Sequence, residues 1–516
     1  MARYAAVDIG SNSIRLLIAE TTADSRNKLP AISTLQADRS VTRLGASVFQ
    51  TGRLSEEAIA SLCSQLERMA ALYRKMEVAG VRVVATAAVR DASNQHEFIE
   101  RASQAAGTPV EIISGQEEAR LIHLGVQSRW PRPHGRVLIV DVGGGSCEVI
   151  LSEGGQLVTA FSKPLGAVRL TEVFLKSDPP TDQELHRLDK SIDERLAAPA
   201  TRIGLGFDRV IATSATAAAV VCAINRVPRA RREEADRLRA TTQQIRKFFR
   251  ETRKLDLAGR RKIGGIGPRR AEIIVAGTAV FLRVLEKFRQ PSMYYLAAGV
   301  RDGIIADLAI RGVGRELTHL TSDQRRVAEE MARRYGVNLK HAKKVGVLAS
   351  EIFEALRPLH RLPPDMGKLL EAAAYLHDVG HFVSDTGHHK HSAYIVENSD
   401  MPGFTDEERQ LIATLCRYHR KAMPAQRHPN YQALSAETRR SALQLIPILR
   451  LADALDRGHE QRVERVGCEM RNGAIVLRLE SDQDVDLEQW AAERAGEMFR
   501  QVYNTPLIVS QAKAGV

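Results

Sequence analysis

The sequence predicts an α/β protein with two similar N-terminal halves, followed by a helical, histidine-rich domain and a small α+β tail. Three observations predict this class. Short β-rich runs alternate with helical patterns up to about residue 310. One Asp-x-Gly-x-x-Ser hairpin pattern occurs twice in that part, and ten of the fifteen histidines lie between His341 and His459. The 516 residues are enough for about two to four domains.

The first half begins with two short strands, AAVDIG and IRLLIAE, around a Gly-Ser-Asn-Ser turn. Residues 54–76 carry the apolar spacing of an amphipathic helix. The run VRVVATAAV predicts a buried strand, residues 96–106 predict a helix, and VEIIS predicts a further strand. These elements follow one another as in an α/β domain.

The repeated pattern stands between two strands in both copies. It covers residues 8–13 in the first copy and residues 141–146 in the second, where VLIV precedes it and CEVIL follows it. The segment WPRPHG is expected to be a linker or turn between the copies. Two copies of one hairpin suggest a duplicated domain with a cleft between its halves.

After Gly303 the pattern changes, and residues 316–456 are almost entirely helical in spacing. The last part holds the hairpin GCEMRNGAIVLRL with an Asn-Gly turn, an amphipathic helix over residues 490–503 and the short strand LIVS. The predicted domains are residues 1–130 and 131–310 for the two halves, 316–460 for the helical domain, and 461–516 for the tail.

The balance of residues excludes a disordered, collagen-like or fibrous protein, since 44% are hydrophobic and 26% are charged. The net charge is +12, and most of it lies between Arg226 and Arg270, where sixteen Lys or Arg face five Asp or Glu. Only Phe248 and Phe249 could stack on bases there. A polyanion without bases is favoured over nucleic acid as partner; a solvated arginine-rich insertion is the alternative.

Cysteine usage and apolar runs bear on the compartment. The five cysteines are odd in number and form no Cys-x-x-Cys pair, so no disulfide framework is expected. The longest apolar run, IIVAGTAVFL, is about half of the roughly 18–20 residues that span a membrane. The start MARYAAVDIG leads into a strand pattern rather than a signal peptide. We expect a cytoplasmic protein with no membrane partner.

The two hairpins offer the donors that a phosphate needs, backbone N–H groups and hydroxyls without steric bulk. These donors belong to Gly10, Ser11, Asn12 and Ser13 in one copy and to Gly143, Gly144, Gly145 and Ser146 in the other. Asp8 and Asp141 end their strands and are expected in the same space. Carboxylates tolerate phosphate only beside a cation, and Mg²⁺ suits this arrangement. An ordinary Gly-rich hairpin is the alternative for either copy alone.

Glu117 and Glu118 follow a strand and open a helix. They are either acidic residues favoured by the helix dipole or a general base that activates water for attack on a terminal phosphate. Glu148, two residues past the Gly loop, is a candidate second carboxylate that holds the metal or orients the water. No Gly-x-x-x-x-Gly-Lys-Ser/Thr pattern is visible, so the sequence does not indicate a P-loop enzyme.

Four segments in order, DIGSNSIRLLIAE, ATAAVRDASN, IISGQEEARLIHLGV and DVGGGSCEVIL, resemble the exopolyphosphatase and guanosine pentaphosphate phosphohydrolase (Ppx/GppA) family. The resemblance covers residues 1–303 and is weaker beyond them. It implies two ribonuclease-H-like halves of the actin-like, sugar-kinase-like superfamily, with the active site between them. It also implies a homodimer and metal-dependent hydrolysis of the terminal phosphate of polyphosphate or of guanosine pentaphosphate (pppGpp).

By motif position, the resemblance implies that Glu118 is the catalytic base and that Asp141 and Glu148 hold the metal or orient water. Arg90 matches an arginine of the family that would neutralise phosphate charge. Arg269 is a plausible polyphosphate contact.

The sequence departs from the family pattern at two positions. Glu272 stands where the family usually has Asp. In Thr213-Ser214-Ala215-Thr216, Ala215 replaces a usual glycine. A methyl group there would narrow a nucleoside pocket and slightly disfavour a guanosine substrate.

The helical domain has its own motif. His377-Asp378 in LHDVG, with His341 upstream and Asp453 downstream, resembles the HD phosphohydrolase superfamily. That resemblance implies a divalent metal held by these four residues, and His and Asp suit a transition metal. The runs HHKHS and RYHRK offer ligands for a second metal. A structural relic with polar core groups is the alternative.

The function expected first is that of an exopolyphosphatase, a hydrolase of phosphoric anhydrides that releases orthophosphate by Mg²⁺-dependent water attack. Hydrolysis of pppGpp by the same site is the second possibility. A sensor that binds these ligands without turnover is the third. A kinase ranks last, because no adenosine-binding Gly-rich motif is visible near Ala215 or Gly277.

Overall fold

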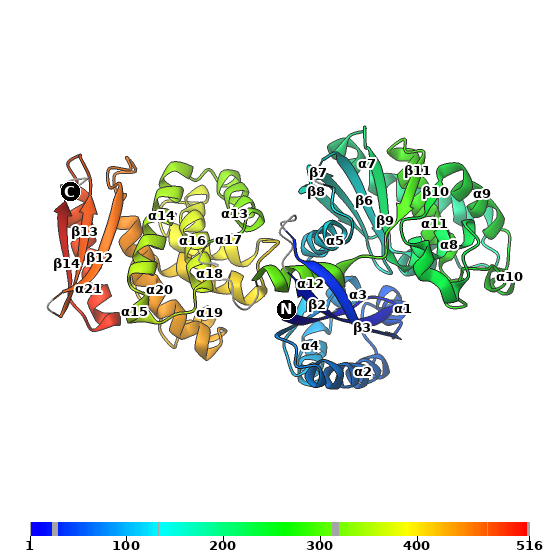
Figure 1. The fold of residues 1–516 in the computed structure, drawn as a ribbon, viewed down its shortest axis with the longest axis horizontal. Coiled ribbons are helices and arrows are strands. Elements are labelled where there is room, and N and C mark those ends of the chain that lie inside the picture. The colour runs from blue at the N-terminus through cyan, green and yellow to red at the C-terminus, as the bar shows by residue number, and fades with distance from the viewer. Residues whose placement is uncertain (1, 23–28, 133, 312–318, 472, 513–516) are drawn as a thin grey trace. The chain divides into compact units, whose positions relative to one another are not determined.

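The structure is a computed structural model and describes residues 2–22, 29–132, 134–311, 319–471 and 473–512. The chain divides into two compact units, Met1–Val313 (unit 1) and Gly314–Val516 (unit 2). Each unit is described by itself (Figure 1). Among the described residues, no helix has both the length and the apolar character needed to cross a membrane.

The first half of unit 1 is a five-stranded sheet in the order β3-β2-β1-β4-β5. Strands β1, β4 and β5 run parallel, and β2 and β3 are antiparallel to their neighbours. The elements are β1 (Ala2–Ile9), β2 (Ser13–Thr22), β3 (Ala31–Val41), α1 (Leu44–Thr51), α2 (Glu56–Lys75), β4 (Gly80–Ala85), α3 (Ala87–Arg90), α4 (Gln95–Ala106), β5 (Val110–Ile112) and α5 (Gly115–Arg129).

The second half is a six-stranded sheet in the order β10-β11-β9-β6-β7-β8. Its elements are β6 (Arg136–Val142), β7 (Cys147–Glu153), β8 (Gln156–Lys163), α6 (Ala167–Phe174), α7 (Asp182–Ile203), β9 (Arg209–Thr213), α8 (Ser214–Ile224), η1 (Arg229–Ala235), β10 (Arg239–Thr241), α9 (Thr242–Thr252), α10 (Leu257–Arg261), α11 (Ile274–Lys287), β11 (Ser292–Tyr295) and α12 (Val300–Arg311).

The two sheets share one topology. Read from its other edge, the order β8-β7-β6-β9-β11 repeats β3-β2-β1-β4-β5, with the same parallel and antiparallel pairs. The duplication inferred from the repeated hairpin therefore extends over both halves, and the α/β class predicted for this part is confirmed.

Successive side chains along each strand point to opposite faces of the sheet, and both faces are buried by helices. In β1, Val7 and Ile9 pack with α2 and α4, whereas Tyr4 and Ala6 pack with α12. In β6, Val140 packs with the helices of its own half, and neighbouring residues on the opposite face pack with α5. Each sheet thus lies between two helical layers.

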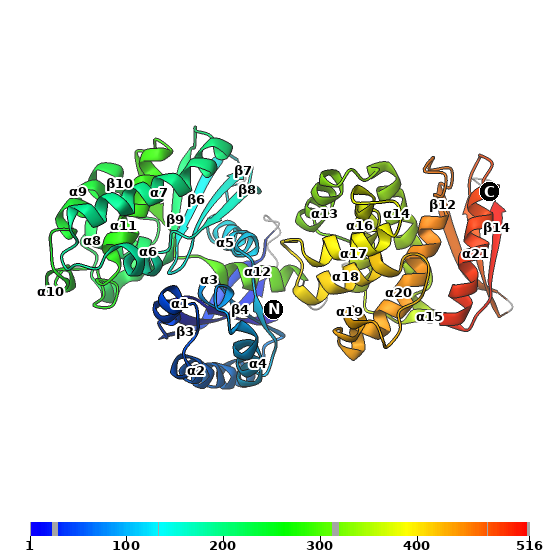
Figure 2. The same cartoon turned by 180° about the vertical axis from the view of Figure 1, so that it is seen from behind.

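The two halves exchange a helix. Helix α5 follows the first sheet but packs on β7 and β8 of the second, and α12 follows the second sheet but packs on β1, β2 and β4 of the first. Figures 1 and 2 show α5 beside β7 and β8, and α12 beside the first sheet. The helices cross at Gly125 and Gly303, where a Cβ would lie 2.4 Å from the Gly299 carbonyl oxygen and 1.8 Å from the Leu121 carbonyl oxygen, respectively.

One predicted strand is shorter than expected. The run VRVVATAAV was expected to be a strand throughout, but β4 ends at Ala85 and the turn of helix α3 follows. Thr86 N still donates to the Ile9 carbonyl of β1, whereas Arg90 N donates to the Thr86 carbonyl, so a helical turn begins where the pairing with β1 ends. This turn brings Arg90 Nη1 to 3.6 Å from Glu118 Oε2.

Unit 2 contains a helical region and a three-stranded sheet in the order β12-β13-β14. Its elements are α13 (Ser322–Arg334), α14 (Leu339–Ala355), α15 (Arg357–His360), α16 (Asp365–Leu376), η2 (Val379–Phe382), α17 (His388–Glu397), α18 (Asp406–Tyr418), α19 (Pro429–Gln432), α20 (Ala436–Ala454), β12 (Arg465–Arg471), β13 (Ala474–Glu480), α21 (Asp486–Tyr503) and β14 (Leu507–Ala512).

One hydrophobic core runs through the helices and the sheet of unit 2, from Val345 on α14 to Ile475 and Leu477 on β13. The hairpin predicted near the C-terminus is formed by β12 and β13. Of its Asn-Gly turn, Asn472 lies outside the described residues, and Gly473 has φ +76°. Strand β14 then pairs parallel with β13.

Candidate active site

The two Asp-x-Gly-x-x-Ser hairpins of unit 1 form the same turn. Gly10 N donates to the Ser13 carbonyl at 3.1 Å, and Gly143 N donates to the Ser146 carbonyl at 3.0 Å. A helix then anchors each turn: Gly45 N at the start of α1 donates to the Ser11 carbonyl, and α6 anchors the second turn in the matching way. The repeated sequence pattern thus folds into two equivalent loops.

The two loops touch across the cleft. A Cβ added to Gly145 would lie 2.7 Å from Ser11 Oγ and 2.8 Å from Ala87 Cβ, and one added to Gly144 would lie 3.0 Å from Ser11 Cβ. The glycines of the second loop therefore do more than expose N–H groups. They allow the two halves to approach each other closely at the cleft.

A cavity of about 560 Å³ lies where the loops meet. Most of the predicted site residues line it: Asp8, Gly10, Ser11, Asn12, Ser13, Glu118, Asp141, Gly143, Gly144, Gly145 and Ser146. Arg90, Glu148 and Arg269 are not among its lining residues. The two halves thus bring both loops and three of the predicted carboxylates to one space.

Glu118 lies in the first turn of α5, which Ser114 caps by accepting from Glu117 N. It is buried, and its Oε2 lies 3.6 Å from Arg90 Nη1. Burial raises the pKa of Glu118 to about 7; Arg90 opposes this shift, and the Asp8 and Asp141 carboxylates add to it. A carboxyl group with this pKa can accept a proton near neutral pH.

Arg90 lies behind Glu118 rather than on the cavity wall. Its Nη1 also donates to the Ile113 carbonyl at 2.6 Å. Arg90 was expected to contact phosphate, but in this structure its described partners are Glu118 and Ile113. At this position Arg90 can orient the Glu118 carboxylate and stabilise its ionised form, rather than bind the substrate directly.

Glu148 is fully buried on β7, next to the cavity residues Glu118 and Asp141. Ser162 Oγ donates to Glu148 Oε1 at 2.7 Å. The Oε2 atoms of Glu148 and Glu118 have no hydrogen-bond partner within the described part of the chain. Burial and the neighbouring carboxylates raise the pKa of Glu148 well above its ordinary value.

The remaining two carboxylates, Asp8 and Asp141, stand one residue before the ends of β1 and β6. Burial raises the pKa of Asp8 and of Asp141, although Arg15 lowers both and Thr213 Oγ1 donates to Asp141. Neighbouring carboxylates that raise one another's pKa, as these do, repel one another unless they share protons or a cation. The set fits a divalent cation with oxygen ligands, such as Mg²⁺.

Five arginines line the same cavity: Arg15, Arg39, Arg232, Arg270 and Arg301. Burial and the neighbouring guanidinium groups lower the pKa of Arg39 to about 10 and that of Arg270 to about 9. Like charges held this closely favour an anionic ligand. Sequence reasoning missed Arg15, Arg39 and Arg301. A signal was present at Arg15, the one charged residue within the apolar run IRLLIA.

A second cavity of about 490 Å³ shares lining residues with the first, namely Asn12, Arg39, Ala215, Arg232 and Arg270. It adds Arg229 and Arg269. Four arginines of the basic stretch between Arg226 and Arg270 therefore line the two cavities. Others pair on the protein itself, as Arg246 does with Glu286 and Arg260 with Asp178.

The Thr-Ser-Ala-Thr turn opens α8 beside both cavities. Ser214 has φ +85°, the left-handed region that favours glycine, and its Oγ accepts from Thr216 N and Ala217 N. Ala215 lines both cavities, as expected for a residue that narrows a pocket. Glu272, the other departure from the family pattern, forms an ion pair with Arg43 at 3.1 Å.

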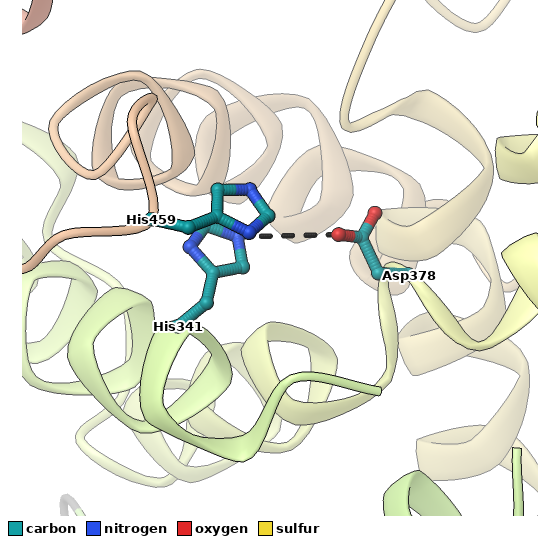
Figure 3. A group of neighbouring side chains, drawn as sticks. All are labelled: His341, Asp378 and His459. Carbon is teal, nitrogen blue, oxygen red and sulfur yellow. Dashed lines mark ion pairs between the residues drawn. The ribbon is translucent and has the colours of Figure 1, made fainter. Parts of the chain in front are cut away.

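The four metal-ligand candidates of unit 2 also meet. His341, His377 and Asp453 offer ligand atoms within 4.8 Å of one another, and so do His341, Asp378 and His459. Figure 3 shows His341 and Asp378 pointing toward each other, with the His459 ring beside that of His341. A third group joins Asp378 to His381 and His388.

Two duplicated halves, with matching glycine hairpins and a buried carboxylate at the cleft between them, are typical of phosphatases of the actin-like fold. The chain belongs to the Ppx/GppA phosphatase family: the family model matches residues 17–311, and the model of the family's domain III matches residues 324–494. The predicted family is thereby confirmed, and the protein is a hydrolase acting on phosphoanhydride bonds. Members of this family generally depend on a divalent metal and act on polyphosphate or guanosine polyphosphates.

Solved structures support the assignment. The Ppx/GppA family member of Aquifex aeolicus is 31% identical, with a TM-score of 0.52 over 60% of this chain and 98% of that one. An exopolyphosphatase-like protein is 29% identical, with a TM-score of 0.55 over 59% and 97%. An exopolyphosphatase from Cytophaga hutchinsonii, 24% identical, shares the fold, with a TM-score of 0.55 over 60% and 98%.

Proposed function

We propose that the protein is an exopolyphosphatase that releases terminal orthophosphate from inorganic polyphosphate. The observation that carries the proposal is the set of arginines shared by the two cavities. Arg232 and Arg270 line both, while Arg229 and Arg269 lie only in the second. Guanidinium groups divided between two cavities that share lining residues suit a chain of phosphates better than a single terminal phosphate.

Features of the same cavities weigh against pppGpp as the main substrate. Among the described residues that line either cavity, Tyr295 is the sole aromatic side chain on which a base could stack. The Ala215 methyl group takes space where the family pattern has glycine. The homodimer implied by the resemblance and the cytoplasmic location expected from the sequence belong to this proposal as well.

The protein's own groups would act in sequence on the terminal phosphate. The two loops would hold it through N–H groups and hydroxyls of residues 11–13 and 144–146, because the N–H groups of Gly10 and Gly143 already donate within their turns. Glu118 accepts a proton from a water molecule, which attacks the phosphorus in line with the leaving phosphate oxygen. Arg90 keeps the Glu118 carboxylate in place, and the cavity arginines offset the charge of the remaining phosphates.

The carboxylates of the cleft fit Mg²⁺, because the partly buried Asp8 and Asp141 lie near the fully buried Glu148 and all three have raised pKa values. In addition, Glu148 Oε2 has no hydrogen-bond partner within the described residues. These three residues would hold the ion. When bound, Mg²⁺ supplies positive charge to the phosphate oxygens.

The test is orthophosphate release with Mg²⁺ from long-chain polyphosphate and, in parallel, from pppGpp. Wild type is compared with Glu118→Gln and with Glu57→Gln, a control on the exposed face of α2. Release from polyphosphate that is lost in Glu118→Gln alone supports the proposal. Release from pppGpp alone favours the second substrate. Tight binding without release from either would make the protein a sensor and overturn the proposal.

A further inference from the structure

We propose that Glu117 and Arg120 are positioning residues for hydrolysis in the cleft: they fasten the N-terminal end of α5 to α12 and so determine where Glu118 lies. The inference rests on the proposed function, in which Glu118 accepts the proton of the attacking water. Neither Glu117 nor Arg120 lines either cavity. Both would therefore act through Glu118 and not by touching the substrate.

The Glu118 carboxylate has one ion-pair partner among the described residues. This partner is Arg90, whose Nη1 lies 3.6 Å from Glu118 Oε2, and that oxygen has no hydrogen-bond partner in the same part of the chain. A general base must come within hydrogen-bond reach of the water that it deprotonates. The position of Glu118 therefore depends mainly on the helix that carries it, and in particular on the first turn of α5.

Glu117, the neighbour of Glu118 in the chain, is 5% exposed and binds the guanidinium groups of Arg120 and Arg82. Arg120 Nε lies 2.7 Å from Glu117 Oε2, and Arg120 Nη2 lies 2.8 Å from Glu117 Oε1. Arg82 Nη1 lies 3.2 Å from the same Oε1. The bidentate pair fixes the direction of both side chains, and Arg82, which belongs to β4, ties them to the first sheet.

Arg120 also joins α5 to α12. Its Nη2 lies 2.9 Å from Oδ1 of Asp307 on α12. Asp307 is itself held by Arg82, whose Nη1 lies 3.2 Å from Oδ2, and by Arg311 one turn along α12, whose Nε lies 3.0 Å from the same oxygen. Since α12 packs on β1, β2 and β4, Arg120 connects the helix that carries the base to the body of the first half.

The network reaches the sheet that carries Asp8. Arg82 also contacts Glu111 of β5, with Nη2 2.9 Å from Oε2. Strand β4 pairs in parallel with β1, and Val84 of β4 is opposite Asp8. Glu118 is therefore placed relative to the same sheet as Asp8, as is needed when the base and the groups around the phosphate have to keep one geometry.

The first turn of α5 is also held from the second half. Gln116 Nε2 donates to the Ala160 carbonyl of β8 at 3.2 Å, and a Cβ at Gly115 would lie 2.4 Å from Ser162 Cβ. The turn thus lies between β8 and the charged network. Loss of the network would leave the turn held on one side, so it could shift and move Glu118 with it.

The network is balanced in charge and largely buried. It contains three carboxylates and three guanidinium groups, those of Glu111, Glu117, Asp307, Arg82, Arg120 and Arg311. Except for Glu111 and Arg311, these residues are 6% exposed or less. Burying charges costs desolvation, and apolar residues in place of a balanced pair are often equally or more stable. Stability alone therefore does not account for the network, whereas its directional hydrogen bonds define one position for the helix.

A small shift of the base is expected to slow the reaction strongly. Moving a reacting group by about 1 Å can cost about 10²-fold in rate. The loops and the arginines that line the cavities lie outside the network, so binding of the substrate should change little. Variants of the network are therefore expected to lower kcat and to leave KM nearly unchanged.

The first test replaces the pair by apolar residues of similar length, Glu117→Met together with Arg120→Met. The rest of the network keeps two charges of each sign, so the urea midpoint should stay close to that of wild type. kcat for orthophosphate release is expected to fall about tenfold or more, with KM nearly unchanged. Wild-type kcat in a double variant of wild-type stability would overturn the proposal.

Two further proteins complete this test. Asp193→Met with Arg283→Met is the matched control, because this ion pair joins α7 to α11, with Arg283 Nε 2.9 Å from Asp193 Oδ1, and lines neither cavity. It should keep kcat, and an equal fall of kcat in the control would overturn the proposal. If the apolar pair does not fold, Arg120→Lys takes its place, since it keeps the charge but not the fork of donors. Its kcat should fall at unchanged KM, and wild-type kcat would overturn the proposal.

The second test asks whether Glu117 and Arg120 act through Glu118. The apolar pair is added to Glu118→Gln, and the residual release of orthophosphate is measured at high protein concentration. If the pair acts by placing Glu118, its replacement costs nothing further once the carboxylate is gone. A further loss by the same factor as in the wild-type background would show an effect that does not pass through Glu118, and would overturn the proposal.

Both tests are run with long-chain polyphosphate and with pppGpp, because the inference needs a reaction in the cleft but not a particular one of these substrates. If Glu118→Gln keeps wild-type activity, the proposed role of Glu118 fails and this inference fails with it. If Glu118→Gln loses activity while the apolar pair keeps it, only this inference fails. Loss in both proteins, with KM unchanged in the apolar pair, supports it.

Discussion

Gly303 of α12 lies against the backbone of Leu121 of α5 so closely that a Cβ at position 303 would lie 1.8 Å from the Leu121 carbonyl oxygen. Helix α5 also carries Glu118 in its first turn. This contact therefore determines how closely the two halves pack and where Glu118, the candidate base, lies.

Gly303→Ala is expected to destabilise unit 1 by about 3 kcal/mol or more, because backbone cannot move aside as a side chain can. Urea unfolding measures the loss. Gly264→Ala is the control, since a Cβ there meets no atom within 4 Å. Equal stability of the two variants would contradict the close crossing.

Replacing Arg90 is expected to move the pH dependence of polyphosphate hydrolysis. Burial raises the pKa of Glu118 to about 7, and Arg90 lowers it. A general base must be deprotonated, so kcat/KM rises with pH through this pKa. Arg90→Gln should shift that limb to higher pH, and Arg90→Lys should restore part of the shift. Arg101→Gln is the surface control. If the rise of kcat/KM with pH does not move in Arg90→Gln, Arg90 does not lower the pKa of the catalytic base.

The second cavity is expected to matter for long chains only. Arg229→Ala and Arg269→Ala should raise KM for long-chain polyphosphate roughly tenfold or more, the effect of one charged contact of about 1.5–3 kcal/mol. They should leave tripolyphosphate nearly unchanged, whereas Arg270→Ala affects both substrates. Arg250→Ala, exposed on α9, is the control. Equal effects on both chain lengths would show that polymer does not reach this cavity.

Ala215→Gly is expected to raise the activity on pppGpp relative to polyphosphate. Ala215 lines both cavities, and removing its methyl group opens space for a nucleoside. The ratio of kcat/KM for the two substrates is the measurement, and each preparation serves as its own control for folding. A ratio equal to that of wild type would mean that Ala215 does not contribute to substrate choice.

Acid is expected to weaken unit 1 through Asp307 of α12. Burial opposes ionisation, but Arg120, Arg311 and Arg82 hold the pKa of Asp307 well below its ordinary range. Its stabilisation is therefore full above the unfolded pKa of about 3.9 and is lost as pH falls below it. Asp307→Asn should reduce stability at pH 7 and flatten the loss below pH ~4, as urea unfolding at several pH values will show. A wild-type slope that survives the substitution would contradict this account.

Much of the cleft could be predicted because its chemistry sits in continuous segments. The loops around Gly10 and Gly143 are local turns set by their own residues, and Glu118 begins a helix directly after a strand. The residues from His341 to Asp453 were also identified by type and spacing, and the structure brings them together.

What the sequence could not provide depends on contacts between distant segments. Arg39 and Arg301 reach the cavity from a strand and a helix that only the folded sheet brings together. The contact of Gly145 with Ser11 joins two halves more than a hundred residues apart. The sequence predicted that Arg90 neutralises phosphate charge. Its contact with Glu118 could not be predicted, because that contact depends on where β4 ends and the helical turn begins.

The helix exchange has a consequence for how unit 1 can be divided. A polypeptide ending near Trp130 would keep α5 without the strands it covers and would leave one face of its own sheet without α12. The remaining piece would in turn lack α5 on the strands β7 and β8, so each piece would expose a sheet face that is covered in the whole chain. Co-produced, the two pieces are complementary, and orthophosphate release would return only when they reassemble, which makes this phosphatase a natural candidate for a split-enzyme reporter.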